Sequence, residues 1–142
     1  MLEELQWVYE LACDPDPLHL RRVRRFVTVC LRRHGQRTIE TDCLLVASEL
    51  ASNAVLHART QFSVSMCGQS RSVLIMVHDG SPSPPKPIPF GPASEAGRGL
   101  FIVSQCADDW GVTLDEDEQG KTVWARIERR APAGGRGRAA AT

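Results

Sequence analysis

The stretch Ser48-Glu49-Leu50-Ala51-Ser52-Asn53-Ala54-Val55 lies in a part of the chain with helix-forming residues. Glu49 and Asn53 are four residues apart, so both side chains lie on one helix face, one turn above the other. An amide oxygen is a suitable ligand for Mg²⁺, and a carboxylate can orient or deprotonate a nucleophile. The pair alone is more typical of an exposed helix face, so its meaning depends on residues further along the chain.

A second feature is an aspartate at the end of an apolar run. Residues 73–77 are all apolar, which predicts a buried strand, and Asp79-Gly80 comes directly after His78. An aspartate before a glycine is typical of a turn. It can also offer a carboxylate to a ligand rich in hydrogen-bond donors, such as the amino group of adenine.

A third feature, Gly97-Arg98-Gly99-Leu100, opens a predicted helix over about 98–107. Glycines there allow a phosphate to approach backbone N–H groups at the start of a helix. Two other phosphate-binding motifs are excluded. A dinucleotide fingerprint needs a glycine where Ile102 stands, and the P-loop suggested by Gly120-Lys121-Thr122 needs a glycine where Asp115 stands.

The remaining pattern predicts strand, helix, helix, strand, strand, loop, helix, strand, strand. We expect strands over 5–11, 61–67, 72–79, 109–115 and 121–128, with helices over 18–34, from about 38 to 58, and 98–107. Gly35 is placed to end the first helix as a C′ glycine. Directly successive strands favour a two-layer α/β sandwich: a mixed, mainly antiparallel sheet with about three helices on one face.

Between the second and third features lies a loop over 81–96, with five prolines within eight positions. Charge is balanced over the 142 residues, with 17 basic and 17 acidic side chains. Four arginines and no acid fall in 129–142, so residues 1–128 carry a net charge of −4 and form the expected domain. We expect the basic tail, 129–142, to be disordered. An acidic body argues against direct nucleic-acid binding.

Other sequence features indicate a cytoplasmic protein. No apolar run approaches the roughly 20 residues of a membrane helix, and the acidic start of the chain does not suit a secretory signal. The five cysteines show no metal-binding spacing and are expected to be reduced, buried and apolar in character. Six arginines on the first helix form either a solvated face or a docking face for an acidic partner.

Taken together and in this order, the three features resemble the GHKL ATPase superfamily, which has the Bergerat fold. Residues 5–128 are covered. The segment 49–58, the segment 97–103 and the ending Gly120-Lys121-Thr122-Val123-Trp124-Ala125 look most like the bacterial anti-sigma-factor serine kinases and their small actinobacterial relatives. The loop over 81–96 would then be the ATP lid, and its prolines would stiffen it against a large closure.

The resemblance also implies roles for single residues. Asn53 would bind Mg²⁺, Glu49 would be the general base, and Asp79 would select adenine over guanine. Thr122 would support adenine beside that aspartate. Four residues would lie at the phosphates: Gly97, Arg98, Gly99 and Leu100.

The function implied is an ATP-dependent serine protein kinase that regulates transcription by partner switching. Its partners would be a sigma factor and a small antagonist protein that it phosphorylates, and a homodimer is compatible with the resemblance. The alternative is a non-catalytic module that binds ATP or only docks to proteins.

Overall fold

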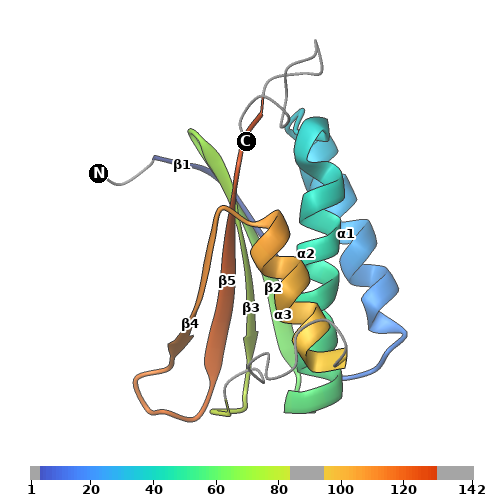
Figure 1. Ribbon diagram of the computed structural model, residues 1–142, viewed down its shortest axis with the longest axis vertical. Helices are drawn as coiled ribbons and strands as arrows, with labels where there is room; N and C mark the ends of the chain where they lie inside the picture. The colour runs from blue at the N-terminus through green and yellow to red at the C-terminus, as the bar shows by residue number, and fades with distance from the viewer. Residues whose placement is uncertain (1–3, 84–94, 131–142) are drawn as a thin grey trace.

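In the part of the chain that the structure describes, five strands form one sheet in the order β1-β2-β3-β5-β4 (Figure 1). The computed structural model describes residues 4–83 and 95–130. Within these ranges every strand pairing is antiparallel, so the mixed sheet expected from the sequence has no parallel pair. The strands are β1 (Leu5–Cys13), β2 (Phe62–Gln69), β3 (Ser72–Asp79), β4 (Asp109–Leu114) and β5 (Lys121–Glu128).

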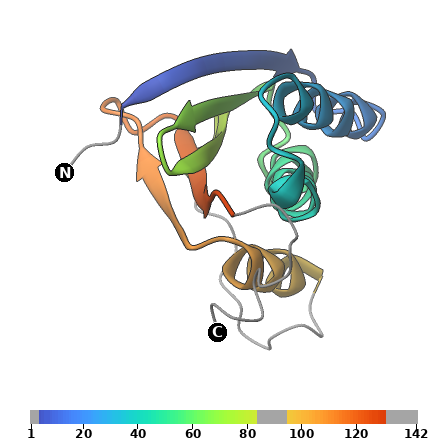
Figure 2. The same cartoon turned by 90° about the horizontal axis from the view of Figure 1, so that it is seen from above.

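Three helices cover one face of this sheet, and the two views agree on this arrangement (Figures 1 and 2). The helices are α1 (His19–Arg33), α2 (Glu40–Asn53) and α3 (Glu95–Cys106). A short 3₁₀ turn, η1 (Arg37–Ile39), precedes α2, and a π-helical turn, η2 (Ala54–Ala58), comes after it. The expected α/β two-layer sandwich is confirmed.

The core lies between the two layers and obeys the periodicity of the sequence. On α1, Val23, Val27 and Leu31 recur every four residues and are fully buried. On β5, alternate residues are buried against the helices, with Val123, Ala125 and Ile127 on that face. Full burial of a valine, leucine or isoleucine side chain contributes about 1.5–3 kcal/mol.

Helix ends differ in how well the sequence predicts them. Gly35 has φ +69°, and the N–H of Gln36 bonds the carbonyl of Leu31, so α1 ends at a C′ glycine as expected. The second helix passes into η2 and ends at Arg59, which has φ +57°. The third helix begins at Glu95, three residues earlier than expected, so Gly97 lies inside its first turn.

The folded body extends past residue 128. The N–H of Arg129 bonds the carbonyl of Arg71, and the Arg130 guanidinium lies 3.9 Å from Asp42 and 3.8 Å from Asp108. Residues 131–142, the rest of the expected tail, and residues 84–94 of the expected lid lie outside the described residues.

None of the five cysteines forms a disulfide, and four are buried whereas Cys106 is half-buried. Within residues 4–83 and 95–130, no helix combines the length and apolar character needed to cross a membrane.

Candidate functional site

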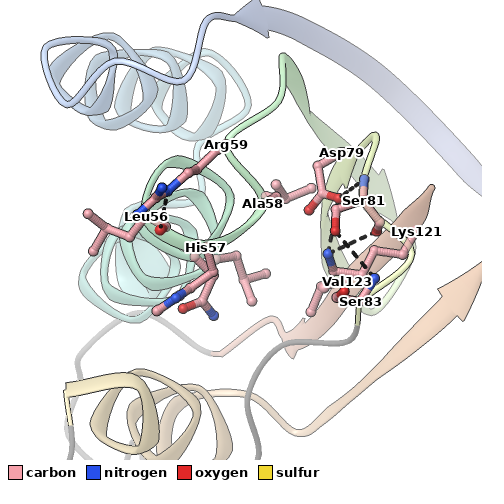
Figure 3. A pocket seen from close by; sticks show the side chains of 12 residues that line it. Leu56, His57, Ala58, Arg59, Asp79, Ser81, Ser83, Lys121 and Val123 are labelled. Atoms are coloured by element: carbon pink, nitrogen blue, oxygen red, sulfur yellow. Dashed lines mark hydrogen bonds and ion pairs between the residues drawn. The ribbon is translucent and has the colours of Figure 1, made fainter. Parts of the chain in front are cut away.

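A cavity of about 330 Å³ lies where the C-terminal end of α2 faces the ends of β3 and β5 (Figure 3). The helical side contributes Leu50, Asn53, Leu56, His57, Ala58 and Arg59, and the sheet and its adjoining loop contribute Val77, Asp79, Ser81, Ser83, Lys121 and Val123. The volume falls within the range of small-molecule sites. The structure therefore brings together Asn53 and Asp79, which are 26 positions apart in the sequence.

Asn53 is the last residue of α2 and lines the cavity. Its Nδ2 atom is buried and has no hydrogen-bond partner among the described residues. Because a buried polar atom without a partner is costly, this amide is suited to meet a ligand. The two ends of an amide have the same shape, so a half-turn of the side chain presents the oxygen in place of the nitrogen.

Asp79 is the last residue of β3, and its side chain is only 4% exposed. It lies on the helix-covered face of the sheet because the strand alternates and Val77 is buried on that face. Its Oδ1 atom accepts bonds from the N–H of Ser81 at 2.8 Å and from Nζ of Lys121 at 3.0 Å. This carboxylate is therefore held in one orientation on the cavity wall.

Lys121 is a site residue that the sequence analysis missed. Its side chain is 6% exposed, and Nζ bonds both Asp79 Oδ1 and the carbonyl of Ser81, the latter at 3.2 Å (Figure 3). The sequence held one signal for it, since the inward alternation of Val123, Ala125 and Ile127 extends back to position 121. Removing one partner of a buried ion pair typically costs about 3–5 kcal/mol, so Lys121 and Asp79 depend on each other.

Gly120 allows β3 and β5 to meet closely beside this ion pair. A Cβ atom at Gly120 would lie 2.6 Å from the carbonyl oxygen of Asp79 and 2.6 Å from Oδ2 of Asp115. The first of these contacts is impossible without moving the backbone at Asp79. The glycine therefore helps to fix where the Asp79 carboxylate sits.

Thr122 does not line the cavity. It pairs with His78 across the β3–β5 ladder, while Asp79 pairs with Lys121. Because neighbouring residues of a strand point to opposite faces, Thr122 lies on the face of the sheet away from the helices. The position beside Asp79 that the resemblance assigned to Thr122 is taken by Lys121.

The remaining predicted site residues are not among the described residues that line the cavity. Glu49 is half-buried one turn before Asn53 and is not among the lining residues. Leu100 is 3% exposed and also does not line the cavity. Gly97 and Gly99 belong to the start of α3, and the side chain of Arg98 lies outside the described part of the chain.

The π-helical turn and its C-cap add two basic side chains to the cavity. The N–H of Arg59 bonds the carbonyl of Ala54, five residues earlier, and His57 and Arg59 both line the cavity from the helical side. Figure 3 shows them across from Asp79 and Lys121. Basic groups on this rim favour an anionic ligand.

The donor set fits a magnesium nucleotide better than a bare metal ion. Among the described residues there is no group of three or more His, Cys, Asp or Glu side chains that could hold a metal. Mg²⁺ commonly takes one or two protein ligands and completes its shell with phosphates and water. Asn53 is the residue of the cavity that would hold Mg²⁺ bound to phosphates, through its amide oxygen once a half-turn of the side chain exchanges that oxygen with the buried, unpartnered Nδ2.

Comparisons with known proteins agree with this geometry. A family model described as the histidine kinase-like ATPase domain matches residues 13–127. The crystal structure of the RsbU and RsbW domains of Rv1364c from Mycobacterium tuberculosis superposes with a TM-score of 0.70 at 17% identity. The match covers 90% of this chain and 34% of that one, so this chain spans about a third of its length. A search of curated proteins finds no significant match.

At 17% identity the structural likeness concerns the fold, whereas the family model covers the helix, the strand and the turn that carry Asn53, Asp79 and Gly97. The family model confirms the expected GHKL resemblance, and ATP binding is the function that the family supports. This chain belongs to the histidine kinase-like ATPase domain family.

Proposed function

We propose that this protein binds Mg-ATP in the cavity between α2 and the ends of β3 and β5, and acts in the cytoplasm as an anti-sigma-factor type of serine protein kinase. The observation that carries the proposal is the meeting of the buried Asp79 carboxylate and Asn53, whose amide nitrogen has no partner among the described residues, in one cavity. Asp79 would accept a hydrogen bond from the base. Asn53 would hold Mg²⁺ at the phosphates, with Gly97, Arg98 and Gly99 near them at the start of α3.

In the proposed transfer, the hydroxyl oxygen of a serine on a small antagonist protein attacks the γ-phosphorus. The bond from that phosphorus to the β–γ bridging oxygen breaks, ADP leaves, and the serine proton passes to the Glu49 carboxylate. Mg²⁺ supplies neutralisation of the phosphate charge when bound. Partner switching between that antagonist and a sigma factor, and a homodimeric state, belong to this proposal through the resemblance alone.

One observation favours a second candidate, a non-catalytic ATP-binding module. Glu49 does not line the cavity, so the general base of the kinase proposal stands apart from the place where the nucleotide would bind. Its side chain is only half-buried on α2, one turn before Asn53. A domain with this arrangement can bind ATP and dock to a partner without transferring phosphate.

Calorimetric titration with Mg-ATP tests nucleotide binding. We expect the wild type to bind and Asp79→Asn to bind about 10- to 100-fold more weakly, because an acceptor for the base is lost from a buried site. Asp115→Asn is the matched control, since this aspartate pairs with His78 on the other face of the sheet. Thermal melts verify that each variant folds, and Asn53→Ala should lose the Mg²⁺ dependence of binding.

Transfer of labelled γ-phosphate to an antagonist protein separates the two candidates. As a kinase, the wild type labels the antagonist, and Glu49→Ala keeps ATP binding but loses labelling. Binding of ATP without labelling by the wild type favours the non-catalytic module. Absence of Mg-ATP binding at millimolar concentration removes both candidates.

A further inference from the structure

The buried pair of Asp79 and Lys121 has hydrogen-bonding capacity that the described residues do not use. A carboxylate offers two acceptor oxygens and an ammonium offers three N–H donors. The bonds that the described residues donate to the Asp79 carboxylate both end on Oδ1. Lys121 donates two hydrogen bonds, one to Asp79 and one to the carbonyl of Ser81. An acceptor at Asp79 and a donor at Lys121 therefore remain side by side on the cavity wall.

Such a neighbouring acceptor and donor matches the edge of either purine. Adenine presents an amino donor next to a ring-nitrogen acceptor, and guanine presents a carbonyl acceptor next to a ring N–H donor. A carboxylate alone accepts a hydrogen bond from the adenine amino group. It makes no hydrogen bond to the guanine carbonyl, because both groups are acceptors. A carboxylate beside an ammonium satisfies both bases, because the ammonium can donate to the carbonyl while the carboxylate accepts from the ring N–H.

We infer that Lys121 is a base-recognition residue which, with Asp79, makes this site accept guanine as well as adenine nucleotides. The inference rests on the proposed nucleotide site and changes its specificity. By the resemblance, Asp79 would select adenine, because guanine offers a carbonyl where adenine offers its amino group. The register of β3 and β5, which pairs Asp79 with Lys121, supplies a donor for that carbonyl.

Burial strengthens the effect of this pair on base choice. Lys121 and Asp79 are nearly fully buried, with side chains 6% and 4% exposed, so water does not replace a missing hydrogen bond there. A polar group left unmatched in such a place weakens binding strongly. The donor that Lys121 provides should therefore decide how well a base with a carbonyl at this position binds.

Titration of the wild type with Mg-ATP, Mg-GTP and Mg-inosine triphosphate tests the inference first. Inosine carries the guanine carbonyl and ring N–H but no amino group. We expect the three dissociation constants to agree within about 10-fold. If GTP and inosine triphosphate bind more than about 100-fold more weakly than ATP, the inference is overturned while the proposed function stands. If none of the three binds, the proposed function fails as well.

The variant Lys121→Met keeps the length of the side chain and removes its donor. We expect the ratio of the GTP to the ATP dissociation constant to rise by about 10- to 100-fold. Arg126→Met is the matched control, because it removes a basic group from the same strand on the opposite face, where Arg126 pairs with Glu128. An unchanged ratio in folded Lys121→Met overturns the inference, and the wild-type titrations decide it if this variant does not fold.

Discussion

At the scale of single residues, buried thiols give the protein a dependence on alkaline pH. Burial raises the pKa of Cys30 to about 11 and raises that of Cys43 further, with Asp42 adding to the shift at Cys43. In the unfolded chain both thiols ionise near their ordinary pKa, about 9. The unfolded state thus loses protons first, so this stabilisation is complete below about pH 9 and is lost as the pH rises toward 11.

We expect the midpoint temperature of thermal unfolding to fall as the pH is raised from about 8.5 to about 10.5. It should fall less in the double variant Cys30→Ala, Cys43→Ala. Differential scanning calorimetry at fixed ionic strength measures both slopes. Cys67→Ala is a single-site comparison, since burial raises the pKa of that thiol as well. Parallel slopes in wild type and double variant would show that other groups cause the alkaline loss.

The residues of the site differ in how far the sequence predicts them. Asn53 and Asp79 can be found from local pattern, one from helical spacing and one from its place at the end of an apolar strand. Thr122 and Lys121 depend on which face of β5 meets the cavity, which is set by the pairing of residues 42 positions apart. The resemblance assigned the position beside Asp79 to Thr122, one residue after Lys121. A shift of one residue along a strand moves a side chain to the opposite face of the sheet.

At the scale of elements, the junction of α2 and η2 is the part of the fold that periodicity did not foresee. Residues 54–58 continue the apolar helical pattern of α2. A π-helical turn holds more residues than an α-helical turn but uses the same amino acid types, so the pattern does not reveal it. The π-helical turn matters because it places His57 and Arg59 on the cavity. The start of α3 at Glu95 escaped prediction for a related reason, since glycines inside a first turn resemble a boundary.

Arg59 provides a test of this junction. Its φ of +57° is favourable for glycine and strained for a residue with a Cβ atom. We expect Arg59→Gly to raise the free energy of unfolding by about 0.5–1 kcal/mol and to weaken Mg-ATP binding, since a cation leaves the cavity. Arg59→Ala should weaken binding equally without the gain in stability. Urea denaturation of the three proteins measures the difference, and equal stability of the glycine and alanine variants would refute it.

At the scale of the whole molecule, Arg129 and Arg130 join parts of the chain that are distant in sequence. Arg130 lies between carboxylates at the start of α2 and after α3, and its carbonyl accepts a bond from the hydroxyl of Thr38. Arg129 bonds the carbonyl of Arg71 through its N–H and Gln6 through its guanidinium. These contacts tie the end of β5 to several distant regions of the fold, although composition places both arginines in a basic tail.

Truncation distinguishes this role from that of the later residues. A chain ending at Glu128 loses these bonds, and we expect its free energy of unfolding to fall by about 1–3 kcal/mol. A chain ending at Arg130 keeps them and should unfold at the temperature of the full chain. Thermal melts of the three lengths measure this, and equal stability of the chains ending at 128 and 130 would contradict it.

The edge position of β1 has a consequence for how the protein is made. β1 pairs only with β2 among the described strands, and their register joins Cys13 to Phe62 and Leu5 to Gln69. At about 5–20 residues per second of translation, roughly 3–10 s separate the synthesis of β1 from that of its partner. During this interval α1 and α2 can already form local contacts, whereas the strand has none of its ladder. Because β1 is synthesised well before β2, the pairing of these two strands belongs to the late, non-local phase of folding.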